Sequence, residues 1–162
     1  MKKLKIYLDT SVISFHFADD APEYRDITID FFKHNSRSYD LFISDVVMLE
    51  INANPDLAMK RKMLDLIRDF KIKILEPTKQ QETEIQTIAE RYIKDKIIPQ
   101  KKKEDAYHIA FATCFEIEIL LSWNFKHLAN VKKNLVVIGV NRSIGYTKDI
   151  RLCNPLEVMD EE

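Results

Sequence analysis

The sequence is short of glycine. Its 162 residues include only two, Gly139 and Gly145, and neither lies in a GxGxxG or GxxxxGKS/T pattern. Those patterns bind nucleotides because glycine lets the backbone approach phosphate groups closely. Rossmann-type dinucleotide binding and Walker-type nucleotide hydrolysis are therefore poor candidates.

Cysteine is equally scarce. The two cysteines, Cys114 and Cys153, are far apart in the chain and form no CxxC pair. A zinc site or a disulfide framework needs more cysteines at closer spacing. We therefore expect two reduced thiols.

The chain also lacks an excess of charge of one sign, and it has no long apolar run. Its formal net charge is -1, so any recognition of nucleic-acid phosphates must be local and not a bulk effect. No apolar run approaches the ~20 residues that span a bilayer, and the start of the chain lacks the apolar stretch and cleavage site of a secretory signal. We expect a cytoplasmic protein with no membrane association.

The composition that remains is that of a soluble globular protein, with 46% apolar and 31% charged residues. A chain of this length fits one domain. No repeat, low-complexity tract or linker divides it. We therefore expect a single domain over residues 1–162.

Short apolar runs alternate with helical periods along the chain. The runs predict strands at Leu4–Leu8, Leu41–Ile43, Ile72–Leu75, Ile119–Leu121 and Ile150–Cys153. The helical periods are centred on residues 24–31, 59–70, 85–92 and 106–113. Since each parallel strand pair needs a crossover, this alternation predicts an α/β fold of three layers, α/β/α, with a mostly parallel central sheet.

In such a sheet ligands bind beyond the carboxyl ends of the strands, so acidic residues near those ends are the first candidates for a site. Asp9 follows the first strand, and its simplest interpretation is a helix N-cap. Glu50 shares a helix face with Val46 and Val47, and a buried carboxylate needs a partner because burial of a lone charge is costly. That partner is either a metal ion or, as the alternative, a Lys or Arg in an internal salt bridge. Asp105 stands just before the expected helix at 106–115, where an isolated Asp would again be an N-cap.

Carboxylates that converge at one sheet edge repel one another, and their pKa values rise unless a cation neutralises them. Oxygen ligands of this kind suit Mg²⁺ or Mn²⁺ and not zinc. A divalent ion there can polarise a phosphodiester and activate a water molecule for attack on phosphorus. The three acids are thus compatible with a metal-assisted phosphodiesterase, although spacing alone does not select that chemistry.

Four segments, in order, resemble the motifs of PIN domains, as found in VapC-like toxins of bacterial toxin-antitoxin pairs. YLDTSVI at residues 7–13 is similar to the first motif, and the second is similar to residues 42–50, FISDVVMLE. EDAYHIA at 104–110 resembles the third motif, and LLSWNF at 120–125 resembles the fourth. Each motif alone is weak, but the ordered set is fairly specific and covers nearly the whole chain.

The resemblance implies a PIN-like α/β/α fold and an Mg²⁺- or Mn²⁺-dependent endoribonuclease that cuts RNA, often a homodimer silenced by an antitoxin. Transferred by position, Asp9, Glu50 and Asp105 would be the catalytic metal ligands. Ser11 would orient Asp9 through its hydroxyl. Asn124 stands where many relatives have a fourth Asp, which puts a second metal in doubt, although an amide can still hold a metal-bound water.

The resemblance also decides one ambiguous segment. Residues 135–140, LVVIGV, have the composition of a buried strand, and the resemblance alone favours a helix there.

Other residues near the expected site have a plainer interpretation. Lys101, Lys102 and Lys103 precede Asp105 and are possible RNA contacts, although a lysine run is more often a solvated loop. His108 lies one helical turn from Asp105, but a lone histidine in a helix is usually structural or surface-exposed. We therefore leave it out of the predicted catalytic set.

Two alternatives to a nuclease come from other classes. A non-catalytic PIN-like module that binds RNA or a protein partner is favoured by Asn124, while the three acids argue against it. A phosphatase of the haloacid-dehalogenase type also begins with an acidic residue after the first strand. That class needs a second Asp where this chain has Ser11, so the phosphatase interpretation is weak.

Overall fold

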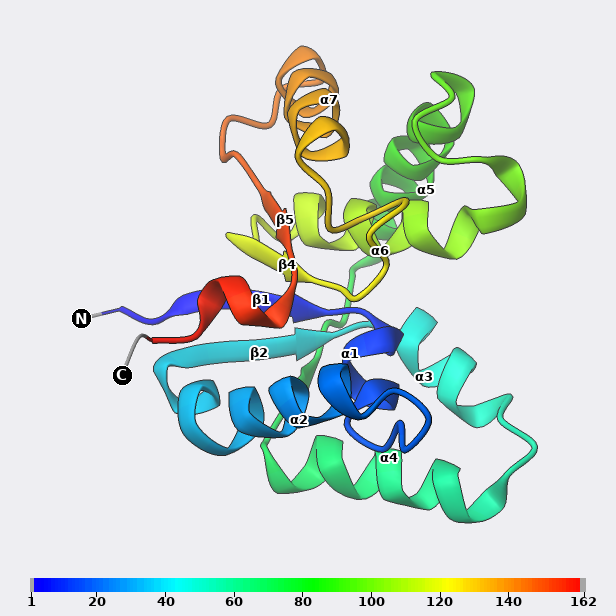
Figure 1. Cartoon of the computed structure of the whole chain (residues 1–162). Coiled ribbons are helices and arrows are strands. Elements are labelled where there is room, and N and C mark those ends of the chain that lie inside the picture. The colour runs from blue at the N-terminus through cyan, green and yellow to red at the C-terminus, as the bar shows by residue number, and fades with distance from the viewer. Residues whose placement is uncertain (1, 161–162) are drawn as a thin grey trace.

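The computed structural model describes residues 2–160, and a parallel five-stranded sheet lies at its centre (Figure 1). The sheet order is β3-β2-β1-β4-β5, and every neighbouring pair is parallel. The strands are β1 (Leu4–Leu8), β2 (Tyr39–Ile43), β3 (Lys73–Ile74), β4 (Ile119–Leu121) and β5 (Arg151–Cys153). The predicted α/β class with a parallel sheet is confirmed.

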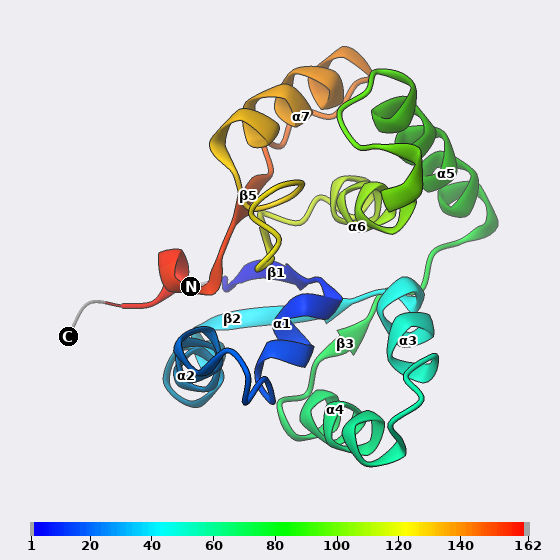
Figure 2. The ribbon, with the colours of Figure 1, turned by 45° about the vertical axis from the view of Figure 1, so that its right-hand side comes forward.

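Helices cover both faces of the sheet. They are α1 (Thr10–Phe15), α2 (Pro22–Asp30), α3 (Asp45–Asn52), α4 (Leu57–Asp69), α5 (Lys79–Lys94), α6 (Lys103–Cys114) and α7 (Val131–Ser143). Figure 2 shows α1, α2 and α4 on one side of the sheet and α5, α6 and α7 on the other. Short helical turns occupy Phe31–Asn35, Ser36–Ser38, Gln100–Lys102 and Pro155–Val158. No helix within residues 2–160 is long and apolar enough to cross a membrane.

The central strand β1 shows why the sheet is parallel and covered twice. Its consecutive residues Ile6, Tyr7 and Leu8 are all fully buried, as expected for a strand with helices on both faces. β2 follows β1 on one side, and β4 joins β1 on the other. The chain therefore reverses its direction of sheet growth at β1, and the crevice beyond the ends of β1 and β4 is where such folds bind ligands.

Side-chain caps begin the helices that surround this crevice. Asp9 caps α1 by accepting from the Val12 amide, and Ser44 caps α3 by accepting from the Val46 amide. These caps satisfy backbone donors that have no partner inside the helix. Both capping residues directly follow a strand, so polar side chains lie at the carboxyl ends of β1 and β2.

Four helices end in the same way despite the shortage of glycine. The residues that follow the caps of α4, α5, α6 and α7 all have positive φ, and they are Lys71, Lys96, Glu116 and Gly145. At each end the next residue donates its amide to a carbonyl five residues back, as Ile72 does to Ile67 at 3.0 Å. This is the Schellman arrangement, which favours glycine at the positive-φ position. Only α7 uses glycine there.

Residues 135–140 lie within α7, so the helix favoured over a strand is confirmed. The residues that α7 buries are Asn134, Val137 and Asn141, while Leu135 and Val136 are 66% and 49% exposed. Asn134 binds the backbone of the edge of the sheet on both sides of Arg151. Local composition pointed to a strand because most of the apolar run is not buried, while the helix docks through Val137 and the amides of Asn134 and Asn141.

Candidate active site

Asp9 lies at the end of β1 and is 4% exposed. Its Oδ1 accepts from the Ser11 hydroxyl at 2.5 Å, and its Oδ2 accepts from the Ser122 hydroxyl at 2.5 Å. Burial raises the pKa of Asp9, although the nearby His108 and the two serine hydrogen bonds act in the opposite direction. The carboxylate thus caps α1 and is also held by the serine that directly follows β4.

The two serines join the ends of β1 and β4 into one network. The Ser11 Oγ accepts from the Trp123 amide at 2.9 Å, and the Ser122 Oγ accepts from the Asn124 amide at 2.9 Å. Each hydroxyl therefore donates to Asp9 and accepts from the backbone that follows β4. The predicted neighbourhood of Ser11 and Asp9 is present, and Ser122 is a member of the site that sequence reasoning missed. Its position directly after a strand, like that of Asp9, was the clue.

Asp105 occupies the first turn of α6, which begins at Lys103. The prediction that Asp105 stands before the helix as a possible N-cap is wrong, because Lys102 takes the capping position without a side-chain bond. The pKa of Asp105 is raised to about 6, first by burial and then by the charges of Asp9 and Glu50, while His108 and Lys102 oppose the rise. Burial and the two acids thus outweigh the positive charge nearby.

Asn124 binds Asp105 directly. Its Nδ2 donates to Asp105 Oδ2 at 3.1 Å. Its Oδ1 accepts from the backbone amides of Lys126 and His127, at 3.2 and 3.0 Å. The amide therefore serves two roles that an aspartate could not combine, since it donates to a carboxylate and also caps the turn that follows.

Glu50 projects from α3 and is paired with a histidine. Its Oε1 lies 3.0 Å from His108 Nε2, and the side chains are 37% and 2% exposed respectively. Burial acts to raise the pKa of Glu50, but the hydrogen bond and charge of His108 outweigh it, and the pKa is lowered. The alternative prediction of a salt bridge to Lys or Arg is wrong about the partner, because Glu50 pairs with His108.

His108 is itself tied to the core. Its Nδ1 lies 2.7 Å from the hydroxyl of Tyr7, which lies 2.7 Å from the Ser44 Oγ. All three of these residues are buried. We expected His108 to be structural or surface-exposed, and it is buried. Its hydrogen bonds could not be predicted from the sequence because they join β1, α3 and α6, which are far apart in the sequence. The spacing of three between Asp105 and His108 was the only local clue.

The three predicted acids all lie at the carboxyl end of the sheet, and the charges of Asp9 and Glu50 act on Asp105. Across residues 2–160, no three Asp, Glu, His or Cys side chains are close enough to form a metal-binding cluster. The donor chemistry nevertheless fits a hard divalent cation, since the acids supply oxygen ligands and excess negative charge. In the described part of the chain the buried Thr10 Oγ1, next to Asp9 in the sequence, makes no hydrogen bond of normal geometry, although Thr10 is near enough to Glu50 to lower its pKa.

Lysines border the same end of the molecule. Lys101 and Lys102 lie in an exposed turn directly before α6, and Lys103 is its exposed first residue. The pKa of His127 is lowered first by burial and then by four neighbouring lysines, among them Lys101 and Lys102. The site thus combines an acidic centre with a basic border.

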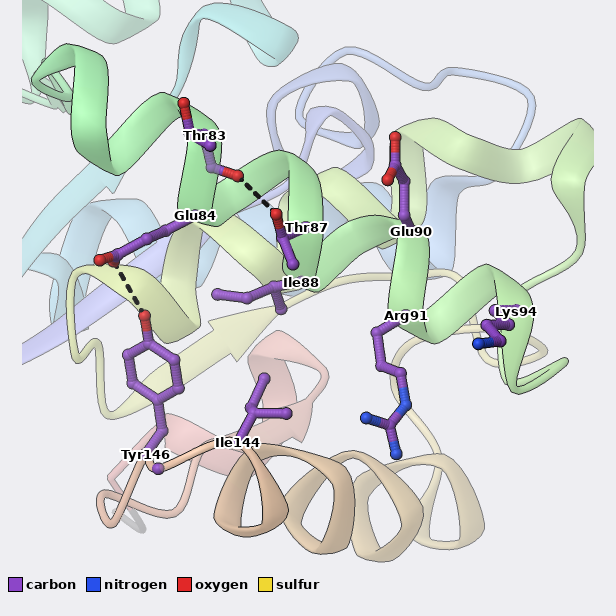
Figure 3. A pocket seen from close by; sticks show the side chains of 10 residues that line it. Thr83, Glu84, Thr87, Ile88, Glu90, Arg91, Lys94, Ile144 and Tyr146 are labelled. Carbon is purple, nitrogen blue, oxygen red and sulfur yellow. Dashed lines mark hydrogen bonds between the residues drawn. The ribbon is translucent and has the colours of Figure 1, made fainter.

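A separate groove of about 630 Å³ lies between α5 and the end of α7 (Figure 3). Ile88 and Ile144 line it, and Glu84 accepts a hydrogen bond from the Tyr146 hydroxyl at 3.1 Å. None of the predicted site residues lines this groove. It is therefore not part of the acidic site.

Comparisons with known proteins agree with this geometry. The family model of the PIN domain matches residues 6–126, more than half of the chain. The chain belongs to the PIN-domain family. PIN domains are generally nucleases, and those nucleases generally use divalent metal ions. The match includes Asp9, Glu50, Asp105 and Asn124.

Solved structures share the fold of this chain. Among them is the crystal structure of VapBC2 from Rickettsia felis bound to a DNA fragment from their promoter, with a TM-score of 0.57 and 12% identity. The alignment covers 75% of this chain and 89% of that one. At this identity the likeness concerns the fold. Among curated proteins, none matches the chain.

Proposed function

We propose that this PIN-domain protein is a metal-dependent endoribonuclease and the toxin of a type II toxin-antitoxin pair. The observation that carries the proposal is Asp105, which is half-buried, feels the charges of Asp9 and Glu50, and has its pKa raised to about 6. A carboxylate in such surroundings is typical of a functional site. The acids stand at the crevice where the order of the sheet reverses, which is the expected ligand site of an α/β fold.

Asp9, Glu50 and Asp105 would hold Mg²⁺ or Mn²⁺. A bound ion of this kind supplies a Lewis acid that polarises the phosphodiester and lowers the pKa of a coordinated water. Ser11 and Ser122 fix the Asp9 carboxylate by donating to its two oxygens. Asn124 orients Asp105 by donating to its Oδ2. Ser11, Ser122 and Asn124 would thus orient the acidic metal ligands toward the scissile phosphate.

The substrate that we propose is RNA, bound through its backbone along the basic border. Lys101, Lys102 and Lys103 are exposed next to Asp105, and phosphate contacts by lysine supply affinity without sequence specificity. As further proposals, the protein acts in the cytoplasm, forms a homodimer and is silenced by an antitoxin. The last is supported by the VapBC complex whose fold it shares.

A second candidate is a non-catalytic PIN-like module that binds RNA or a protein. Two observations favour it. Both the nitrogen and the oxygen of the Asn124 amide bind within the protein, and both oxygens of Asp9 are bound by serine hydroxyls. The acids in that case would serve structure alone.

A cleavage assay separates the two candidates. Wild type, Asp105→Asn, Asn124→Asp and Asn124→Ala are compared on one RNA across a Mn²⁺ titration, with the exposed Asp20→Asn as a control for loss of one charge. The nuclease proposal predicts cleavage by wild type and Asp20→Asn and none by Asp105→Asn. An inert wild type beside an active Asn124→Asp would identify a binding module. If wild type and every variant are inactive on many RNAs, the proposal that this protein is a nuclease is contradicted.

A further inference from the structure

A buried chain of hydrogen bonds ends on the Glu50 carboxylate. It runs from Ser44 Oγ to the Tyr7 hydroxyl at 2.7 Å, on to His108 Nδ1 at 2.7 Å, and from His108 Nε2 to Glu50 Oε1 at 3.0 Å. Tyr7 and Ser44 are 0% exposed and His108 is 2% exposed. Only the last member, Glu50, reaches solvent. The chain therefore connects the rigid centre of the sheet to one acid of the site.

The chemistry of the Glu50 carboxylate fixes the direction of the last bond. An ionised carboxylate only accepts, so His108 Nε2 must donate to Glu50. The other ring nitrogen, Nδ1, lies 2.7 Å from the Tyr7 hydroxyl, which can donate to a neutral imidazole or accept from a protonated one. In both protonation states Nε2 is the nitrogen that donates to Glu50. The Tyr7 hydroxyl thus fixes the ring orientation in which Nε2 faces Glu50.

Together these contacts hold Glu50 at the acidic site. The side chain belongs to the short helix α3 and is partly exposed, so without a partner it would sample several rotamers. The bond from His108 engages Oε1, and the carboxylate could still serve as a ligand of a divalent cation. Outer partners that orient a ligand in this way commonly change metal affinity about 10- to 100-fold.

We propose that His108 is a positioning residue, held by Tyr7 and Ser44, that fixes Glu50 as a metal ligand. The inference rests on the proposed function, because it assumes that the acidic site binds a divalent ion. It assigns roles to three buried polar residues beyond the acids themselves. Their purpose is to present one carboxylate oxygen in a single orientation.

The test measures Mn²⁺ affinity by calorimetry, without RNA. His108→Leu should weaken Mn²⁺ binding about 10- to 100-fold, while His108→Gln, whose amide can still donate to Glu50, should keep most of the affinity. If His108 were merely structural, its loss would not change the Mn²⁺ affinity of a folded protein, and the Leu and Gln variants would bind Mn²⁺ equally well. Equal Mn²⁺ affinity in wild type and a folded His108→Leu variant would overturn the inference.

Tyr7→Phe tests the chain without changing the histidine. Its matched control is Tyr92→Phe, because Tyr92 is also 0% exposed and its hydroxyl binds Asn141 and Thr113 away from the acids. Both variants lose one buried hydroxyl and should lower the melting temperature similarly. Only Tyr7→Phe should weaken Mn²⁺ binding, and equal affinity in the two variants would overturn the inference even if His108→Leu fails to fold.

The proposed function fails in a different way. If wild type binds no Mn²⁺ at all, the metal mechanism falls and this inference falls with it. If wild type binds Mn²⁺ and the variants of His108 and Tyr7 bind it equally well, only the positioning role is overturned. The two failures are therefore distinguishable in one set of titrations.

Discussion

At the scale of single residues, Asp105 links stability to pH. Burial, together with the charges of Asp9 and Glu50, raises its pKa to about 6 in the folded protein, against ~3.9 for an unperturbed Asp. Below pH ~4 the carboxyl is protonated in both states and imposes no penalty. As the pH rises from ~4 to ~6 the unfolded chain releases its proton first, so stability falls, and above ~6 the penalty is constant.

Replacing Asp105 by Asn should therefore stabilise the apo protein at neutral pH. In EDTA at pH 7.5, Asp105→Asn should melt roughly 2 to 4 °C above wild type, the shift that about 1 kcal/mol produces, because screening limits the effect at a partly exposed group. The new amide can still accept from Asn124. The gain should vanish near pH 4, and the exposed Asp20→Asn should show no such pattern. A gain of equal size at both pH values would contradict this account of Asp105.

Asn124 is the residue at which this chain departs from the family pattern. Its Nδ2 donates to Asp105 at 3.1 Å, so Asn124→Asp replaces a donor by a second carboxylate. Without metal the variant should melt below wild type because two carboxylates then face each other. With saturating Mn²⁺ its melting temperature should rise more than that of wild type, since the added charge strengthens metal binding. Thermal melts of both proteins with EDTA and with Mn²⁺ measure the two shifts, and a smaller Mn²⁺ shift in the variant would exclude a ligand role for position 124.

At the scale of helices and strands, the Schellman ends provide a test that is independent of function. Lys71 has φ 53°, a conformation that costs L-residues about 1 kcal/mol and glycine little. Lys71→Gly should therefore stabilise the protein by up to about 1 kcal/mol. The matched control, Lys62→Gly in the exposed interior of α4, should destabilise it by about 1 kcal/mol. Urea unfolding of the two variants measures both signs, and destabilisation by both would contradict the account of the α4 end.

Most elements could be predicted from periodicity because they bury regular apolar faces. β1 and α5 are examples, since consecutive buried residues mark the strand and Ile85, Ile88 and Tyr92 mark the helix. α7 could not, because it docks through Val137 and two buried amides, while Leu135 and Val136 of its apolar run are exposed. The predicted start of α6 was wrong because its capping residue, Lys102, makes no side-chain cap that a sequence pattern could reveal.

The candidate site divides along the same line. The position of Asp9 at the edge of the sheet follows from the strand that precedes it, whereas the resemblance to the PIN motifs grouped Glu50 and Asp105 with it. The partner of Glu50 does not follow, because His108 meets it only when α3 and α6 pack together. Sequence spacing identifies which residues reach an edge, whereas pairing across elements depends on the packed structure.

At the scale of the whole molecule, a metal that binds only the folded state should stabilise the entire chain. Mn²⁺ at 100 times its dissociation constant should add about 2.7 kcal/mol, which raises the melting temperature by roughly 5 to 10 °C in a chain of this size. Mg²⁺ should act similarly, and zinc should substitute poorly because the acids offer only oxygen ligands. Differential scanning fluorimetry with each ion measures this, and a larger shift with zinc would contradict the assignment.

The central claim is that a metal-activated water, held by the acids at the end of the sheet, cuts RNA. Water attack on phosphorus leaves no cyclic phosphate, whereas attack by the RNA's own 2′-hydroxyl produces a 2′,3′-cyclic phosphate. The most direct measurement is therefore mass spectrometry of the fragments from one RNA incubated with the protein in Mn²⁺ and in EDTA. We predict cleavage in Mn²⁺ alone, with fragments that carry no cyclic phosphate. Cleavage that persists in EDTA, or fragments that end in a 2′,3′-cyclic phosphate, would contradict the proposed mechanism.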